Sequence, residues 1–328
     1  MADYDTIAVS MTILYVITMI VALAGNTLLI YIVWKKPGAR NSTSFLFVNM
    51  AVADLLFALL VMPLSIARFY IFFSSVLEAF RCTFYYYAIY VSFLASIFCL
   101  MVMAFDRYFA VVHPFRQSIW FRKPKIITPI IWISSMALMS IIPFAFKLTH
   151  SKCRIHISLI LPFYVTFFAF GFLLPLAVIS VLYTLVARKL WLHEVPVDNN
   201  VSESQREQEI PKKKVIRMLI IVVVVFVVCW LPMHMYQMVV SVSIVVSTRV
   251  PYWGHYVIIY ISYWLSQANS AINPWLYIGL NGKMKAAFKN MIRCRHEEIT
   301  GRGQPFLALT TRKNEVNSTK NTMMEAKM

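Results

Sequence analysis

Residues Cys82–Pro114 read CTFYYYAIYVSFLASIFCLMVMAFDRYFAVVHP, and this stretch decides the fold. About 25 residues separate Cys82 from Arg107. A helix of that length is roughly 37 Å long, enough to cross a bilayer core of about 30 Å. The run begins at a cysteine and ends at the charged pair Asp106-Arg107. Because disulfides persist in oxidising compartments and are rare in the cytosol, the stretch predicts a spanning helix with Cys82 outside the cell and Arg107 inside.

The composition of the whole chain agrees with a membrane protein. Of its 328 residues, 60% are hydrophobic and 14% are charged, and the mean hydropathy is +0.68. A soluble protein carries nearer 25% charged residues. Apolar stretches long enough to span a bilayer cover roughly residues 8–34, 43–71, 79–112, 126–146, 158–191, 215–246 and 252–278. None shows the alternation of a membrane barrel, so we expect an all-α membrane protein built as a seven-transmembrane helix bundle.

The net charge of +17 is distributed unevenly along the chain. Lys and Arg number 25 on the side reached after the first, third, fifth and seventh stretches, and 6 on the other side. Cytoplasmic loops carry such an excess, which predicts an extracellular N-terminus and a cytoplasmic C-terminus at the plasma membrane. The basic face is then expected to meet anionic lipid headgroups, and no nucleic-acid partner is expected.

The segments outside the spans complete the predicted domain organisation. Residues 1–7 are expected to be a short extracellular N-terminus, and 8–280 the transmembrane domain, whose first span is retained and is not a signal peptide. A flexible cytoplasmic loop is expected over about 192–211, with the sixth helix starting in the stretch 212–214. Residues 281–294 form a basic amphipathic pattern typical of an interfacial helix, and 295–328 a disordered cytoplasmic tail.

The five cysteines fall into three groups. Cys82 and Cys153 are the two on the predicted outer face, and we expect a disulfide between them. Cys99 and Cys229 lie within spans and are expected to be inert small hydrophobes. Cys294, at the end of the amphipathic segment, is placed for palmitoylation.

Two polar residues inside the spans need an explanation. Asn26 lies in the first span and requires a partner on a neighbouring helix. Asp54 lies deep in the second span, where an ionisable group is costly and points to a function. The alternative for Asp54 is a purely structural hydrogen-bond hub.

One signature occurs in every span, in order. The set resembles the rhodopsin-like (class A) G-protein-coupled receptors over residues 8 to about 294. The matching residues are Gly25-Asn26, Asn49 with Asp54, Cys82, Asp106-Arg107-Tyr108, Trp132, Pro175 with Tyr183, Phe226 with Cys229-Trp230-Leu231-Pro232, and Asn273-Pro274 with Tyr277.

The resemblance implies roles for many of these residues. Arg107 would engage a heterotrimeric G protein, and Asp106 would hold it at rest; the acidic partner that many relatives carry at the base of the sixth helix is replaced by Lys212. The implied activation residues are Asp106, Arg107, Tyr108, Tyr183, Asn273, Pro274 and Tyr277, and the packing switch comprises Ile97, Pro175, Phe226, Trp230 and Pro232. No cofactor is expected except an allosteric sodium ion, held by Asp54, Ser96, Asn269, Ser270 and Asn273, with water alone as the alternative.

The sequence says less about the ligand. Ile89 stands where amine receptors of the family carry an aspartate, and Gln267 where opsins carry a lysine, which disfavours an amine or retinal. Aromatic, amide and imidazole groups line the predicted outer half of the bundle: Tyr86, Tyr90, Phe93, His234, Gln237, Tyr263 and Gln267. This lining suits a ligand rich in backbone amides. The stretches CWLPMH (229–234) and SQANSAINPWLY (266–277) resemble neuropeptide receptors of the tachykinin and neuropeptide Y type. A lipid or another neutral small molecule is the alternative ligand.

Other functional classes fit poorly. A transporter would need several intramembrane carboxylates or broken-helix repeats, and an enzyme would need a nucleophile with a base or a metal-ligand cluster. Neither pattern occurs in the sequence, so we expect no enzymatic activity. The resemblance implies arrestin and a receptor kinase as further partners, acting on the tail.

Overall fold

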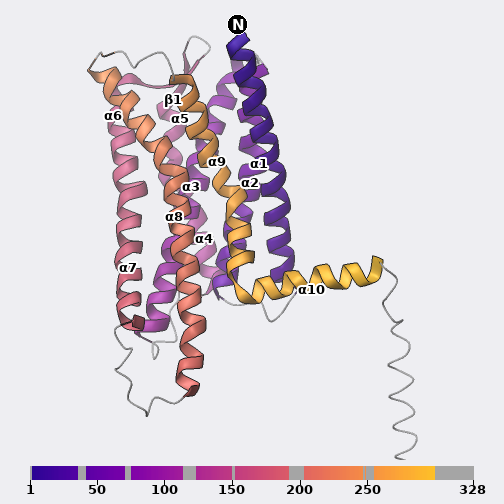
Figure 1. The fold of residues 1–328 in the computed structure, drawn as a ribbon. Helices are drawn as coiled ribbons and strands as arrows, with labels where there is room; N and C mark the ends of the chain where they lie inside the picture. Colours follow the sequence, from indigo (N-terminus) through magenta and orange to yellow (C-terminus); the bar gives the residue numbers. More distant parts are fainter. Residues whose placement is uncertain are drawn as a thin grey trace, which may run out of the picture. The chain divides into compact units, whose positions relative to one another are not determined.

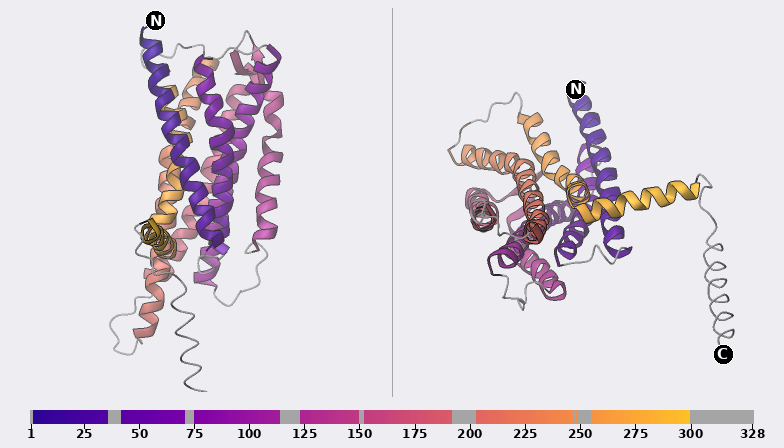
Figure 2. Two further views of the ribbon diagram at one scale, coloured as in Figure 1. Left: turned by 90° about the vertical axis from the view of Figure 1, so that its right-hand side faces the viewer. Right: turned by 60° about the horizontal axis from the view of Figure 1, so that its bottom comes forward.

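The computed structural model describes seven helical spans and one short hairpin (Figure 1). The described residues are 2–35, 42–70, 75–113, 123–149, 152–191, 203–246, 248 and 255–299. The helices of the bundle run side by side, as both views in Figure 2 show. This confirms the predicted all-α membrane bundle.

The first three spans are single long helices. They are α1 (Ala2–Lys35), α2 (Ser42–Tyr70) and α3 (Ser75–Val112). Helix α3 packs against α2, α4, α7 and the hairpin, which places it at the centre of the bundle. The stretch Cys82–Pro114 that predicts the fold therefore supplies its central helix.

The fourth and fifth spans are each built from several consecutive elements. The fourth comprises α4 (Pro124–Leu138), a 3₁₀ turn (Met139–Ile141) and α5 (Ile142–Ala145). The fifth comprises α6 (Ile157–Thr166), a π-helical segment (Phe167–Leu173) and α7 (Leu174–Trp191). Pro175 is the second residue of α7, just after the π-helical segment. Since proline has no backbone N–H, a local change of helix type accommodates it.

The last two spans are α8 (Glu203–Val245) and α9 (His255–Leu280). Within the described residues, six spans are long and apolar enough to cross a membrane. Helix α9 is 26 residues long, about 39 Å, but more polar. Its polar residues face the inside of the bundle: Ser262, Ser266, Gln267, Asn269, Ser270 and Asn273 are all buried.

The outward surface of the bundle is apolar. Leu59, Phe170 and Val228 are each more than half exposed. A soluble protein rarely leaves so many large apolar side chains in contact with water. Lipid is the solvent that this surface suits.

Close packing joins α1 to α9 at a glycine. A Cβ atom added at Gly25 would lie 2.7 Å from Cγ of Pro274 and 2.9 Å from Nε1 of Trp275. Next to it, Nδ2 of Asn26 donates a hydrogen bond to the carbonyl oxygen of Ser270 at 2.9 Å. This is the interhelical partner that the sequence analysis requires for Asn26.

Three element boundaries differ from the sequence predictions. Helix α8 begins at Glu203 and not in the stretch 212–214, because the intervening segment is rich in the helix formers Glu, Gln and Arg. Helix α1 begins at Ala2, so the segment predicted as an N-terminus outside the bundle is helical. Helix α10 (Gly282–Ile299) covers the predicted interfacial segment and continues beyond residue 294.

A short hairpin follows the fourth span and is absent from the sequence predictions. Strands β1 (Phe146–Thr149) and β2 (Lys152–Ile155) pair antiparallel, with Leu148 opposite Cys153. Strands of four residues give too short a pattern to be recognised between apolar helices. The hairpin matters because it carries one cysteine of the disulfide.

Candidate functional site

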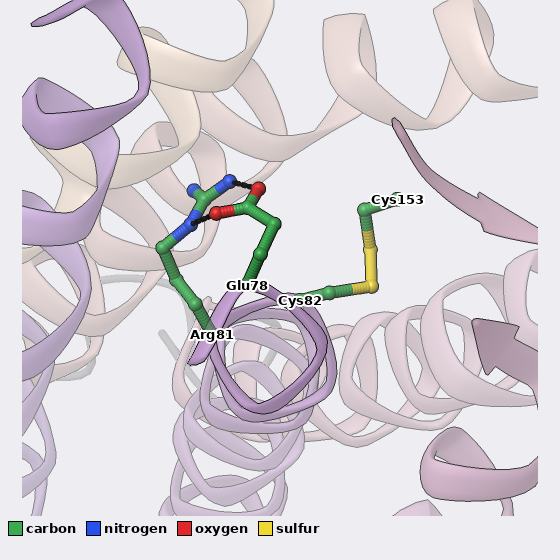
Figure 3. Close-up of a disulfide and its surroundings, with 4 residues drawn as sticks. All are labelled: Glu78, Arg81, Cys82 and Cys153. Carbon is green, nitrogen blue, oxygen red and sulfur yellow. Dashed lines mark hydrogen bonds and ion pairs between the residues drawn. A yellow bond between two sulfur atoms is a disulfide. The ribbon is translucent and has the colours of Figure 1, made fainter. Parts of the chain in front are cut away.

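A disulfide joins the hairpin to the start of the central helix. Cys82 of α3 and Cys153 of β2 are bonded, with Cα atoms 5.5 Å apart (Figure 3). This confirms the predicted pair. We call this end of the bundle the disulfide end, and the opposite end, which holds Asp106-Arg107, the Arg107 end.

An ion pair spans the helical turn that leads into Cys82. The guanidinium of Arg81 donates to both carboxylate oxygens of Glu78, with Nε at 2.8 Å from Oε2 (Figure 3). The positive charge of Arg81 is therefore neutralised locally.

An aromatic cluster occupies the interior toward the disulfide end. His234 of α8 lies among the rings of Phe93, Phe172 and Trp230, with centroids 5.3, 4.7 and 6.5 Å away, and is 2% exposed. Phe93 is fully buried and packs edge-on against Trp230 at 4.6 Å. The structure thus brings two predicted ligand residues, Phe93 and His234, into one cluster.

Polar groups at the edge of this cluster are only partly satisfied. Gln237 donates a hydrogen bond from Nε2 to the hydroxyl of Tyr90 at 3.1 Å. Oε1 of Gln237, Nε2 of His234 and Nε1 of Trp230 are buried and have no hydrogen-bond partner within the described residues. A buried polar atom without a partner costs about 1–3 kcal/mol, so such groups call for an explanation.

The remaining predicted ligand residues lie on α3 and α9. Tyr86 stacks on Phe146 of β1, with ring centroids 4.3 Å apart. Gln267 donates from Nε2 to the hydroxyl of Ser65 at 3.0 Å, and Tyr263 is buried on the same helix. Tyr86 therefore contacts the hairpin, while Gln267 ties α9 to α2.

Sequence reasoning missed two residues at this end, Ser65 and Arg68 of α2. Both line a small cavity with Tyr15, Phe69, Ile259, Tyr260 and Tyr263. In the sequence Arg68 counts only as one of the basic residues of the outer face. An arginine five residues after the helix-kinking Pro63 was the available signal.

A second cavity, of about 370 Å³, opens on the outside of the bundle between α3, α4 and α6. Its lining is apolar and includes Phe170, which is 67% exposed. None of the seven predicted ligand residues lines it.

The predicted packing switch joins the aromatic cluster through Phe226 and Trp230. Ile97 and Phe226 are fully buried. The ring of Phe226 lies 6.4 Å from Phe172 and 6.1 Å from Trp230. Pro175 and Pro232 lie in the neighbouring helices α7 and α8, where each removes a backbone N–H.

Asp54 is buried in the middle of the bundle. Asn273 donates from Nδ2 to its Oδ2 at 3.3 Å. Ser96, Asn269 and Ser270 are also buried, and the hydroxyl of Ser270 bonds within its own helix, to the carbonyl oxygen of Gln267 at 2.8 Å. The side-chain oxygens of Asn269 and Asn273 have no hydrogen-bond partner within the described residues.

At the Arg107 end, Arg107 is held by two neighbours. Its Nη2 donates to Oδ2 of Asp106 at 2.6 Å and also to the hydroxyl of Thr43. Thr43, in the first turn of α2, was missed by the sequence analysis. Tyr108 turns instead toward His113, with a distance of 3.3 Å between its hydroxyl and Nε2.

The two predicted switch tyrosines, Tyr183 and Tyr277, make different contacts. Tyr277 stacks on Phe47 at 4.1 Å and donates from its hydroxyl to the sulfur of Met50 at 3.2 Å. The hydroxyl of Tyr183 is buried without a hydrogen-bond partner in the described part of the chain. Pro274 follows Asn273, the residue that donates a hydrogen bond to Asp54, and it contributes to the tight contact at Gly25.

Two sequence predictions concern side chains outside the described set. The side chains of Lys212 and Cys294 lie there, so their predicted roles stay predictions.

Comparison with known families decides the class of the protein. The family model for the 7 transmembrane receptor (rhodopsin family) matches residues 25–277. The chain belongs to this family. The predicted G-protein-coupled receptor class is therefore confirmed, and with it the expectation that the protein is a signalling receptor and not an enzyme.

Individual relatives cover most of the chain. It is 33% identical over 315 residues to the allatostatin-A receptor of Bombyx mori, covering 91% of this chain and 84% of that protein. It is 31% identical over 297 residues to the somatostatin receptor type 2 of Mus musculus, covering 86% and 76%. The substance-P receptor of Rattus norvegicus is 26% identical over 294 residues, covering 85% and 70%.

Proposed function

We propose that this receptor binds an extracellular peptide among the aromatic and amide side chains of the disulfide end. The observation that carries the proposal is the pair of unpartnered buried atoms, Oε1 of Gln237 and Nε2 of His234, within an aromatic shell. The backbone of a peptide supplies both N–H donors and carbonyl acceptors, whereas a hydrocarbon ligand supplies neither. A bound peptide would repay the cost of these groups.

The relatives support the same ligand class. Allatostatin A, somatostatin and substance P give their names to the three receptors described above. A receptor named for RYamide, from Drosophila melanogaster, is also 26% identical over 294 residues.

The orientation in the membrane is part of the proposal. The disulfide end faces the outside of the cell at the plasma membrane, and the Arg107 end faces the cytoplasm. The disulfide between Cys82 and Cys153 favours an oxidising compartment, and the excess of Lys and Arg at the opposite end favours the cytoplasm.

The mechanism follows from the two ends. At rest, Asp106 and Thr43 hold the guanidinium of Arg107. A peptide with higher affinity for the active bundle shifts the population toward it, with the packing switch linking the aromatic cluster to the cytoplasmic half. Arg107 then leaves Asp106 and contacts the G protein. Tyr183, whose hydroxyl has no partner in the described resting contacts, would gain one in the active state.

A sodium ion fits the surroundings of Asp54. The carboxylate of Asp54 and the unpartnered side-chain oxygens of Asn269 and Asn273 form a set of hard oxygen ligands. Ser96 and Ser270 would complete it with hydroxyl oxygens. The bound cation would offset the buried negative charge and favour the resting state.

Further partners are proposed for the cytoplasmic side. Arrestin and a receptor kinase would act on the tail, anionic lipid headgroups would meet the basic face, and Cys294 would be palmitoylated.

A cell-based screen tests the peptide proposal. Cells expressing the receptor with a promiscuous G protein are exposed to a peptide library and, in parallel, to a panel of lipids and neutral metabolites, with calcium as the readout. We expect a nanomolar response to a peptide, and a loss of potency of tenfold or more in Gln237→Leu. A response confined to the lipid panel would contradict the proposal.

The control variant for this screen is Ser243→Ala. Ser243 lies on the same helix as Gln237, but its hydroxyl bonds to the carbonyl oxygen of Val239 at 2.7 Å and is exposed. Its removal should leave peptide potency unchanged. An equal loss in both variants would mean that Gln237 acts through general stability of α8.

A further inference from the structure

Arg68 is the starting point of a further inference about the ligand. It lies in the last turn of α2, at the disulfide end, and is exposed. It lines the cavity between α1, α2 and α9 together with Tyr15, Ser65, Phe69, Ile259, Tyr260 and Tyr263. The free space there is about 10 Å³, room for one water molecule. A larger ligand group therefore has to bind at the exposed side of the cavity, where Arg68 lies.

The positive charge of Arg68 is not neutralised within the described residues. In the described part of the chain Arg81 pairs with Glu78 and Arg107 with Asp106, whereas Arg68 pairs with no carboxylate. Arg68 instead lies over the ring of Tyr85, 5.7 Å from its centroid. A cation–π contact is weaker than a pair with a carboxylate and leaves the guanidinium donors available.

Arg81 provides the contrast within the same end of the bundle. Its side chain is 12% exposed, and both carboxylate oxygens of Glu78 accept its hydrogen bonds (Figure 3). The two arginines are chemically identical, but only Arg68 presents an unpaired charge to the cavity. A planar guanidinium in this state binds carboxylates through two parallel hydrogen bonds.

The surroundings of Arg68 join it to the proposed peptide site. Ser65, one turn earlier on the same face of α2, accepts a hydrogen bond from Gln267 and lies 3.2 Å from the hydroxyl of Tyr85. Tyr263 lines the cavity and belongs to the predicted ligand set. A peptide that reaches Gln267 and Tyr263 therefore comes within reach of Arg68.

We propose that Arg68 binds a carboxylate of the peptide ligand, supplied by the C-terminus or by an Asp or Glu side chain. The inference rests on the proposed function, because it assigns a chemical feature to the peptide of that same site. It makes Arg68 a specificity-determining residue, and it states that the active peptide is acidic at one position.

Matched peptide pairs test the proposal. The probes are two kinds of matched pair made from the library peptides. In the first, the two peptides differ only in a C-terminal carboxylate or amide. In the second, each Asp or Glu of one peptide is replaced by Asn or Gln in the other. Each is assayed on wild type, Arg68→Gln and Arg68→Lys. We expect Arg68→Gln to lower the potency of the acidic peptide about 10- to 100-fold and to leave its neutral analogue unchanged. Arg68→Lys keeps the positive charge but loses the planar pair of N–H donors, so its potency for the acidic peptide should lie between those of wild type and Arg68→Gln.

The source of the carboxylate is identified by the peptide change that removes the potency difference between wild type and Arg68→Gln. If the terminal carboxylate binds Arg68, C-terminal amidation removes the difference between wild type and Arg68→Gln. If a side chain binds it, exchange of Asp or Glu for Asn or Gln does so. The control is the double variant Glu78→Gln/Arg81→Gln, because it removes a charge pair that neutralises itself and leaves the net charge of the disulfide end unchanged; the ratio of acidic to neutral potency should stay as in wild type.

The contradicting results are distinct. Equal losses for acidic and neutral peptides in Arg68→Gln, or no loss for either, would overturn the assignment of Arg68 while the peptide receptor stands. A wild-type receptor that responds to no peptide would overturn the proposed function and this inference with it. Surface expression, measured through an N-terminal epitope tag, verifies that each variant is folded.

Discussion

Replacing Gly25 with alanine should separate α1 from α9. The added Cβ would lie 2.7 Å from Cγ of Pro274 and 2.9 Å from Nε1 of Trp275. Non-bonded carbon atoms prefer about 3.5–4.0 Å, so the helices must move apart by nearly 1 Å. The rigid ring of Pro274 cannot rotate away as a flexible side chain would.

The expected cost can be stated from known substitutions. Overpacking costs about 1–3 kcal/mol, and a contact that must open by nearly 1 Å against a rigid ring lies in the upper half of that range, at about 2–3 kcal/mol. The change from Gly to Ala returns up to about 1 kcal/mol through helix propensity. The net destabilisation of Gly25→Ala is therefore about 1–2 kcal/mol, which corresponds to a midpoint of thermal unfolding lower by roughly 2–8 °C.

Gly279→Ala is the matched control for this substitution. Gly279 is in the same helix as Pro274, and a Cβ added there meets nothing within 4 Å. The same chemical change should leave the midpoint unchanged or raise it by up to about 4 °C, since only the propensity term remains.

The assay is thermal unfolding of the purified receptor in detergent. A thiol-reactive dye reports unfolding, because Cys99 and Cys229 are free and buried. Opposite signs for Gly25→Ala and Gly279→Ala are the predicted result. A Gly25→Ala receptor as stable as wild type would refute the close contact between α1 and α9.

The remaining predictions concern function. Asp54→Asn should remove the effect of sodium on agonist affinity, measured by radioligand competition with and without NaCl; a persisting effect would rule out the cation site. Thr43→Val removes one hydrogen bond from Arg107, worth about 1 kcal/mol, and should raise basal signalling severalfold in a cAMP or calcium assay, whereas unchanged basal signalling would mean that Thr43 does not restrain it. Cys153→Ser releases the hairpin from α3 and should abolish ligand binding at the cell surface, so normal binding would make the disulfide dispensable.

Much of the fold follows from the sequence because hydropathy is a one-dimensional signal. A run of apolar residues long enough to span a bilayer predicts a helix wherever it occurs, and the charge bias predicts its direction. The disulfide between Cys82 and Cys153 was predictable for the same reason, because these two cysteines fall at one end of the spans.

The contacts between helices were not predictable, because they depend on how each helix is rotated and tilted by its neighbours. The sequence predicted that Asn26 has a hydrogen-bond partner on a neighbouring helix, but it did not indicate that this partner is the carbonyl oxygen of Ser270. It counted Arg68 and Arg81 as equal charges, although only Arg81 has an acidic residue three positions before it on the same helical face.

The start of α8 shows a different limit. The segment that begins at Glu203 is polar, so hydropathy marks it as a loop, whereas its Glu, Gln and Arg residues favour a helix that projects beyond the apolar span. The polar composition predicts a loop there, whereas the helix propensities of the residues predict a helix. The helix forms because extending a long helix that already exists costs less than starting a new one.

Peptide-stimulated nucleotide exchange is the most direct test that peptide binding at the disulfide end drives G-protein activation at the Arg107 end. The purified receptor in lipid nanodiscs is mixed with a heterotrimeric G protein and the active peptide, and exchange is compared for wild type and Arg107→Ala. We predict saturable stimulation of wild type, and in Arg107→Ala retained peptide binding without stimulated exchange. Equal stimulation of both receptors, or exchange that does not depend on the peptide, would contradict the account.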